Sequence, residues 1–309
     1  MKIIDGKACA EHCRRALKER VENLKSRKIT PGLAVILVGN NPASQVYVKN
    51  KIIACEKLGI FSQKIALKEE TNEAELLAHI HQLNQNPNIH GILVQLPLPQ
   101  QISEEAILKA IAPQKDVDGF HAQNLGALVQ NTKALVACTP KGIVRLLDEE
   151  KIEIEGKHAV IIGRSTIVGK PLALLLINRG ATVTVCHSKT KNLAAHTQNA
   201  DILIVAIGRA NFVTQEMVKE GAVVIDVGIN RLPNGKLAGD VDFESVKNKA
   251  AAITPVPGGV GPMTIAMLME NTIAAAQHAE NANGWIQTLA KFLQRLCIKR
   301  FAWALVSKK

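Results

Sequence analysis

The segment that most constrains this chain is Pro255-Val256-Pro257-Gly258-Gly259-Val260-Gly261-Pro262-Met263-Thr264, which contains three prolines and three glycines in ten residues. Proline lacks a backbone donor and glycine resists ordering, so we expect this segment to form a loop rather than a continuous helix or strand. Its glycines would also let the backbone approach a ligand closely. The apolar residues 265–276 that follow predict a helix after the loop.

The remainder of the chain alternates short apolar runs with amphipathic helical stretches. Strands that are apolar on both faces are typical of a parallel sheet covered by helices. We therefore predict an α/β chain. The predicted strands are 33–38, 92–95, 159–162, 181–185, 202–205 and 222–225, and the predicted helices are 43–58, 73–83, 104–111, 141–148 and 170–178.

The length of 309 residues is enough for two domains at roughly 100–200 residues each. The first half gives one α/β unit, and a second begins at about Thr139. We place the boundary at Cys138-Thr139-Pro140, so that residues 1–138 form the first domain and residues 139–262 the second.

The net charge of +11 raises the question of a nucleic-acid partner. Residues 283–309 hold six basic residues and no acidic one, and without them the net charge falls to +5. A modest surplus suits anionic small molecules such as nucleotide phosphates or a glutamylated substrate. We therefore expect no nucleic-acid partner.

No apolar run reaches the ~18 residues that span a bilayer, and the first residues contain no long apolar region. We expect a soluble, cytoplasmic protein. The cysteines form no C-x-x-C pair and no zinc-finger spacing, so we predict reduced thiols and no metal site. They are Cys9, Cys13, Cys55, Cys138, Cys186 and Cys297.

A turn that could hold a dinucleotide, from Gly163 to Gly169, lies between the predicted strand 159–162 and the helix 170–178. Glycines at such a turn let backbone N–H groups face a pyrophosphate at the helix N-terminus. The pattern departs from G-x-G-x-x-G, because Ser165 and Val168 replace its second and third glycines.

The residues that follow the next predicted strand, up to Ser188, contain no Asp or Glu of the kind that usually holds the ribose of NAD. Arg164 and Ser188 could instead hold a 2′-phosphate, which predicts NADP as the cofactor. Ser188 has a structural alternative as the cap of a helix beginning at Lys189. The loops with Gly208 and Ile229 follow later strands and should lie at the same, ligand-binding edge of the sheet.

The first half contains four candidate residues for chemistry. Tyr47 and Lys51 are four residues apart on a predicted helix and so share one face. Gln95 ends a buried strand, an unusual place for an amide without a partner. Asp118 lies in an Asp-Gly turn. Singly, each has an ordinary structural explanation: a solvated lysine beside a core aromatic, a capped strand end and a common turn.

Taken together and in order, these segments resemble the bifunctional methylenetetrahydrofolate dehydrogenase/cyclohydrolase family. The resemblance covers roughly residues 1–280, and one small departure is Ala137, where the family often has proline. The segments that carry it are 31–34, 44–51, 91–99, 115–120, 138–142, 163–165, 226–230, 239–242 and the loop 255–264.

The resemblance implies two α/β domains with a cleft between them, folate on the first and NADP on a Rossmann-like second domain. It also implies that a helix over 263–282 returns to the first domain, and that the protein is a homodimer. Two reactions follow: NADP-dependent oxidation of 5,10-methylenetetrahydrofolate to the 5,10-methenyl form, then hydrolysis to 10-formyltetrahydrofolate. That product feeds purine and formyl-methionine synthesis.

Chemistry then suggests a role for each residue. Oxidising an N–CH2–N carbon removes a hydride and needs positioning more than a strong base, whereas hydrolysis needs an activated water. We assign water activation to Lys51, with Gln95 and Tyr47 orienting it. A carboxylate such as Asp118 can accept two hydrogen bonds from a pterin edge. We expect the substrate to be bordered by Gly258, Gly259 and Thr264.

Three alternatives stay open: a monofunctional dehydrogenase of the same superfamily, a Rossmann oxidoreductase for another substrate, and a non-catalytic protein that acts through its tail. Residues 283–309 contain both tryptophans, Trp285 and Trp303, with helically spaced apolar residues and basic residues off that stripe. Such a helix can bind a membrane. We favour a helix packed on the body or an unstructured extension, and expect its deletion to spare both activities.

Overall fold

The computed structural model describes residues 1–281. The segment 283–309, and with it the prediction that this tail is dispensable, lies outside the described residues. Among the helices of the described part, none is long and apolar enough to cross a membrane.

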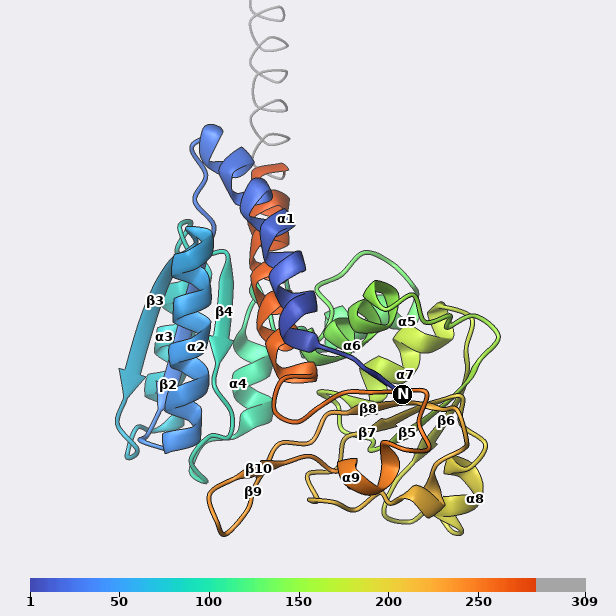
Figure 1. Cartoon of the computed structure of the whole chain (residues 1–309). Coiled ribbons are helices and arrows are strands. Elements are labelled where there is room, and N and C mark those ends of the chain that lie inside the picture. Colours follow the sequence, from blue (N-terminus) through green and yellow to red (C-terminus); the bar gives the residue numbers. More distant parts are fainter. Residues whose placement is uncertain (282–309) are drawn as a thin grey trace, which may run out of the picture.

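The first half of the chain forms a three-stranded parallel sheet within the described residues, with β2 (Gly32–Val38) between β3 (Phe61–Leu67) and β4 (Gly91–Val94). Every residue of β2 is buried, as its continuous apolar run predicts. The connecting helices pack beside this sheet (Figure 1). They are α2 (Pro42–Leu58), α3 (Glu73–Gln85) and α4 (Glu104–Ala110).

The second half forms a larger parallel sheet, whose described strands follow the order β1-β11-β8-β7-β5-β6. The predicted parallel α/β architecture is confirmed. The first strand of the chain joins this second sheet rather than the first. The strands are β1 (Lys2–Ile3), β5 (His158–Ile162), β6 (Thr182–Cys186), β7 (Ile202–Val205), β8 (Val223–Asp226) and β11 (Ala252–Ile253).

Shorter elements complete the two halves. A small antiparallel hairpin leaves the second sheet after β8. The hairpin strands are β9 (Asn230–Arg231) and β10 (Leu237–Ala238), and the remaining helices are α5 (Ala122–Val129), α6 (Cys138–Glu149), α7 (Gly169–Asn178), α8 (Leu193–Thr197) and α9 (Phe243–Val246).

Two long helices join the halves. The first, α1 (Gly6–Ser26), runs beside the returning helix, residues 260–281, as Figure 1 shows in blue and red. Arg20 donates to Gln277 at 2.9 Å, and Arg27 pairs with Glu280. The two helices begin at the same end, so they run parallel.

The returning helix begins earlier than the sequence predicts. Its first helical residue is Val260, so residues 260–264 belong to the helix and not to the loop. Pro262 does not prevent this, because the first helical turn has backbone N–H groups without intrahelical partners and tolerates proline. The loop proper is therefore residues 255–259.

Gly6 is required where α1 meets this loop. A Cβ at Gly6 would overlap the carbonyl oxygen of Gly259. We expect Gly6→Ala to lower the free energy of unfolding by about 1–3 kcal/mol through overpacking, measured by chemical denaturation. The control is Gly126→Ala in α5, where a Cβ meets no atom within 4 Å, and a gain of roughly 0.5–1 kcal/mol is expected. Equal stability of the two variants would contradict this role for Gly6.

Candidate active site

Lys51 and Gln95 meet at the carboxyl edge of the first sheet. Helix α2 begins with Pro42 and is capped by Asn41, whose side chain accepts from Ala43 N at 3.0 Å. Further along this helix, Lys51 Nζ donates to Gln95 Oε1 at 3.0 Å. Gln95 follows β4, and its Nε2 donates to the carbonyl of Leu96 at 2.7 Å, so both ends of its amide are fixed.

Asp118 lies within electrostatic reach of this pair. Burial raises the pKa of Asp118 to about 6; the nearby Lys51 ammonium acts to lower it and the Asp116 carboxylate to raise it. Tyr47, one helical turn before Lys51, is 38% exposed. The structure thus brings Lys51, Gln95 and Asp118 together from three segments, with Tyr47 on the adjoining helix face.

The turn that carries Asp118 is organised by its buried neighbour Asp116. Asp116 accepts hydrogen bonds from Gly119 N at 3.2 Å, His121 N at 2.7 Å and Asn124 Nδ2 at 3.0 Å. Burial nevertheless raises the pKa of Asp116, against the effect of these donors. The turn is therefore shaped before any ligand arrives.

The loop 255–259 and the start of the returning helix carry the other predicted substrate residues. Gly258 has φ +115, a value that only glycine adopts readily. A Cβ at Gly259 would lie 2.7 Å from the Pro255 carbonyl oxygen. Thr264 Oγ1 is 3.0 Å from Thr139 Oγ1 at the start of α6. These residues lie where the two halves meet.

The predicted dinucleotide turn is built around two glycines and a serine. Gly163 has φ +128, and a Cβ there would overlap the Ala206 carbonyl oxygen. A Cβ at Gly169 would overlap the carbonyl oxygen of Gly163. Ser165 Oγ accepts from Val168 N at 3.2 Å and more weakly from Gly169 N at 3.4 Å. The turn is therefore tight, and α7 begins directly behind it.

Arg164 and Ser188 are both exposed, at the ends of β5 and β6. The alternative that Ser188 caps a helix is wrong, because α8 begins at Leu193 and the residue before it is Asn192. Ser188 is thus free of that structural role. Residues 187–189 contain no acid, which fits a 2′-phosphate better than an unmodified ribose.

Two buried aspartates that the sequence analysis left without a role organise the loops after β7 and β8. Asp240 is fully buried and accepts from Ile207 N at 2.7 Å, Gly208 N at 2.9 Å and Arg209 N at 2.8 Å. Gly208 has φ +65. A sequence signal exists, since an acid within an apolar stretch needs buried partners, but the partners are distant in sequence.

Asp226, at the end of β8, holds Asp240 in turn. It accepts from Gly228 N, Asp240 N and Val241 N, each at 2.9 Å. Burial raises the pKa of Asp226 to about 6 although the three amides act to lower it. Ile229 follows in the loop after β8 and is 43% exposed. The two aspartates thus shape both of the loops that the sequence analysis placed at the cofactor edge.

A hollow of about 1030 Å³ lies away from these residues, at the amino ends of the strands of the first sheet. Its lining includes Thr30, Asn88 and His90, which precede or flank β2 and β4, and Ala279 of the returning helix. Parallel α/β sheets bind ligands at the carboxyl ends of their strands. The opposite edge, with Lys51 and Gln95, is therefore the candidate site.

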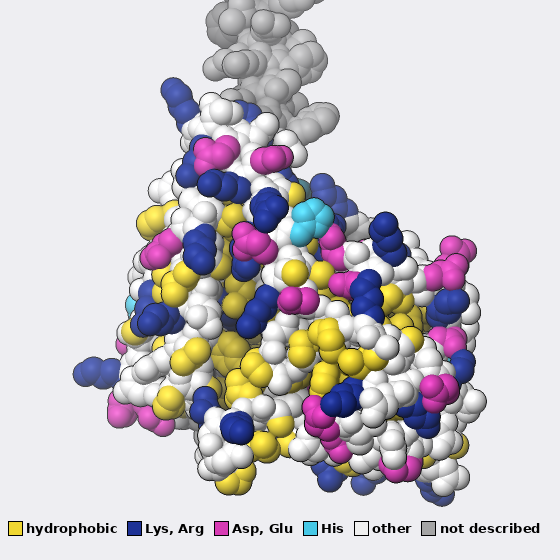
Figure 2. Space-filling model, in the orientation of Figure 1, with side chains coloured by type: hydrophobic (Ala, Val, Ile, Leu, Met, Phe, Trp, Pro, Cys, Tyr) yellow, Lys and Arg dark blue, Asp and Glu magenta, His cyan; other side chains and the backbone are white. Residues whose placement is uncertain are grey.

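The surface agrees with a site between the halves. In Figure 2, hydrophobic side chains gather along the hollowed junction of the two halves, in the region where Figure 1 shows the loop before the returning helix. Ligand sites commonly occur at such domain junctions and combine apolar walls with a few polar groups.

Fold and site together define an α/β enzyme with a dinucleotide-binding second half. A sequence model of the tetrahydrofolate dehydrogenase/cyclohydrolase catalytic domain matches residues 4–118, and one of the NAD(P)-binding domain of the same family matches residues 137–280. The chain belongs to the tetrahydrofolate dehydrogenase/cyclohydrolase family.

Individual relatives agree. The Bifunctional protein FolD of Dechloromonas aromatica is 59% identical over 275 residues, which cover 89% of this chain and 97% of the relative. That of Bacillus subtilis is 56% identical over 275 residues, with the same two coverages. The predicted family is confirmed.

Solved structures extend the likeness to three dimensions. The bifunctional FolD dehydrogenase/cyclohydrolase of Campylobacter jejuni is 54% identical with a TM-score of 0.88, covering 90% of this chain and 99% of that one. The Trypanosoma brucei dehydrogenase-cyclohydrolase, complexed with NADP and an inhibitor, is 38% identical with a TM-score of 0.86, covering 90% and 97%.

The Asp240 contacts generate a prediction. Asp240→Asn replaces an acceptor oxygen by an NH2 group among three backbone donors, which leaves buried polar groups unpaired. We expect a loss of about 1–3 kcal/mol in the free energy of unfolding, measured by chemical denaturation. Asp242→Asn is the control, because the Asp242 side chain caps the short helix α9 through Ser245 N. A loss no larger for Asp240→Asn than for the control would contradict the anchoring role.

Proposed function

We propose that Lys51, Gln95, Tyr47 and Asp118 form the folate-transforming centre of this bifunctional enzyme. It oxidises 5,10-methylenetetrahydrofolate to 5,10-methenyltetrahydrofolate with NADP+ and hydrolyses that product to 10-formyltetrahydrofolate. The observation that carries the residue assignment is the 3.0 Å bond from Lys51 Nζ to Gln95 Oε1, in the electrostatic neighbourhood of Asp118. A monofunctional dehydrogenase would not need this lysine.

The two reactions make different demands on these residues. Removing a hydride from the carbon between two nitrogens needs the folate held in place, which we assign to Asp118 and to the border formed by Gly258, Gly259 and Thr264. Hydrolysis needs a group that moves protons near the attacked carbon. Lys51 can do so, and its bond to Gln95 fixes the position of its Nζ.

NADP, when bound, supplies the hydride acceptor. The residues present fit it: the Gly163–Gly169 turn can approach a pyrophosphate with its backbone, and Ser165 Oγ accepts from Val168 N just before α7. The exposed Arg164 and Ser188 would hold the 2′-phosphate. The loops of Gly208 and Ile229 border the same edge of the second sheet.

We propose the corresponding division of the chain. Residues 1–138 together with residues 263–282 form the folate domain, and residues 139–262 form the NADP domain, so that the boundary falls within the first turn of the returning helix. The separate sheets and the two matched ranges, 4–118 and 137–280, support two units. The strand β1 pairs with β11 of the second sheet, so the first residues of the folate domain belong to the sheet of the NADP domain.

We also propose that the enzyme is a homodimer, as the family resemblance implies. Within the described residues β3 pairs only with β2, and Phe61 on this edge strand is 50% exposed. An edge strand with an exposed aromatic is a surface that another chain can cover. The cytoplasmic location stays a prediction.

Replacing Lys51 should separate the two activities. Lys51→Met removes the proton-carrying group and keeps an unbranched, flexible stem, so we expect hydrolysis of methenyltetrahydrofolate to fall by at least about 100-fold, the contribution typical of general acid–base catalysis. NADP binding should persist. The measurement is the decay of methenyltetrahydrofolate absorbance with each purified protein.

The matched control is Lys49→Met, which changes an exposed lysine of the same helix. It should hydrolyse methenyltetrahydrofolate at the unaltered rate. Near-normal hydrolysis by Lys51→Met would contradict the assignment.

Asp118 should give folate binding a pH dependence. Its raised pKa of about 6 means that the carboxyl gains a proton, and loses its charge, as pH falls through 6. We therefore expect kcat/KM for methylenetetrahydrofolate to be level above about pH 7 and to fall below about pH 6, since this ratio reports ionisations of the free enzyme. Steady-state rates between about pH 5 and pH 8 test this.

Asp118→Asn should remove this inflection and raise the folate KM, because an amide turns one acceptor into a donor. The expected loss of folate-binding free energy is about 1–3 kcal/mol, or more because the group is charged. NADP affinity should not change. An inflection that persists in Asp118→Asn would show that another group titrates.

A further inference from the structure

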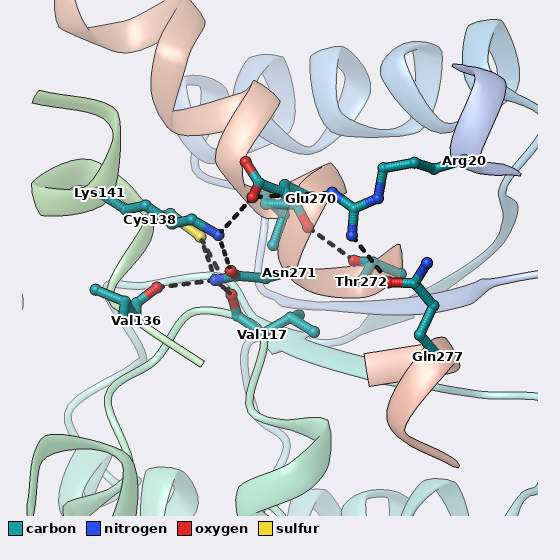
Figure 3. Close-up of polar contacts among 10 residues, drawn as sticks. Arg20, Val117, Val136, Cys138, Lys141, Glu270, Asn271, Thr272 and Gln277 are labelled. Atoms are coloured by element: carbon teal, nitrogen blue, oxygen red, sulfur yellow. Dashed lines mark hydrogen bonds and ion pairs between the residues drawn. The ribbon is translucent and has the colours of Figure 1, made fainter. Parts of the chain in front are cut away.

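Asn271, on the returning helix, is 1% exposed, and its amide connects three parts of the chain (Figure 3). Its Nδ2 donates to the carbonyl oxygens of Val117 and Val136, each at 2.8 Å. Its Oδ1 accepts from Lys141 Nζ, in α6, at 2.9 Å. Carbonyls only accept and an ammonium only donates, so a single orientation of the amide satisfies these three contacts. In that orientation Nδ2 also lies 3.6 Å from Cys138 Sγ.

The two carbonyls belong to segments on either side of Asp118. Val117 immediately precedes Asp118, and Val136 precedes Ala137, on which the turn packs. Gly119 has φ +76, and a Cβ there would overlap the Ala137 nitrogen. The Asn271 amide thus holds the Asp118 turn against the chain segment that leads into α6.

The same helix carries Thr264, seven residues before Asn271, which is two turns along one face. Thr264 contacts Thr139 and Asn271 contacts Lys141, and both partners lie in the first turn of α6. The returning helix therefore contacts the first turn of α6 at two positions, two helical turns apart. One rigid element sets the positions of both the loop 255–259 and the Asp118 turn.

Lys141 is itself held in place by charge. Its Nζ lies 3.2 Å from Glu270 Oε1, and Glu270 lies 3.9 Å from Arg20 of α1 (Figure 3). A partly buried ammonium is costly unless it is paired. Glu270 supplies the countercharge for Lys141, and Arg20 of α1 in turn lies beside Glu270. The ammonium group that orients the Asn271 amide is therefore held in position by these charges.

We propose that Asn271 is a positioning residue of the folate site, which sets where Asp118 stands relative to Thr264 and the loop 255–259. Its buried amide cannot touch substrate, so it is not a catalytic residue. The inference rests on the proposed role of Asp118 in binding folate. A residue that only stabilised the fold would affect both substrates alike, whereas Asn271 should affect folate alone.

The test is Asn271→Leu, which keeps the size of the side chain and removes all of its polar contacts. We expect the KM for methylenetetrahydrofolate to rise at least about tenfold, since a misplacement of about 1 Å can cost up to about 100-fold. The NADP KM should change less than about twofold, as expected for a distant, independent site. Steady-state kinetics with each substrate varied gives both values.

The matched control is Thr272→Val on the adjacent, fully buried residue, whose Oγ1 donates only within its own helix, to Leu268 O at 2.8 Å. It should lower thermal stability and leave the folate KM unaltered. A folate KM in Asn271→Leu no higher than in Thr272→Val would overturn the proposal, as would equal increases in both KM values.

Two further variants keep the test decisive. If Asn271→Leu does not fold, Asn271→Ser replaces it, because a hydroxyl can donate to one carbonyl and should give a smaller, folate-specific rise; an unaltered KM there would overturn the proposal. Asp118→Asn is measured in parallel. If Asp118→Asn leaves the folate KM unaltered, the proposed role of Asp118 is wrong. If Asp118→Asn raises the folate KM but the Asn271 variants do not, only the inference about Asn271 is wrong.

Discussion

A single apolar core crosses from one half of the molecule to the other, and the relative placement of the two sheets depends on it. The core contains Val35 of the first sheet, Ile161 of the second, and Met267 and Ile273 of the returning helix. Each such side chain contributes about 1.5–3 kcal/mol when fully buried. The helices α1 and 260–281 are therefore structural parts of both halves, and neither half has its own core on the side where they meet.

Apolar packing sets the layers, but buried polar groups set the loops. Asp116 shapes the Asp118 turn, Asp240 holds the loop of Gly208, and Asn271 ties the first turn of α6 to the returning helix. Hydrophobic contacts are non-directional, whereas hydrogen bonds require particular distances and angles. No buried side-chain nitrogen or oxygen among the described residues lacks a partner, so these loops are specified by complete sets of contacts.

The fold could be predicted where burial is continuous, and less well elsewhere. Runs such as Ile202–Val205 predict their strands to the residue. The edge strand β3 is missed because Ser62, Gln63 and Lys64 interrupt its apolar pattern. Helix α1 is missed because small and sulfur-containing residues such as Cys9 and Cys13 form the first half of its buried face, before Leu17, Val21 and Leu24. Among the residues of the proposed site, Lys51 and Gln95 can be proposed from their local sequence context. Asp240 and Asn271 are not, because their partners lie far away in the sequence.

Under the proposed assignment, the two reactions depend differently on this architecture. Lys51, Gln95 and Asp118 all belong to the first half, so the groups assigned to water activation are placed mainly within one half, with the Asp118 turn also tied to α6 through Asn271. Hydride transfer needs a folate held by the first half to meet a nicotinamide held by the second, at a separation of roughly 3–3.5 Å between reacting atoms. A distance that short, set across two domains, requires a stiff connection. The shared core and the parallel pair of long helices provide it, which gives a physical reason for α1 and the returning helix to lie side by side at this junction.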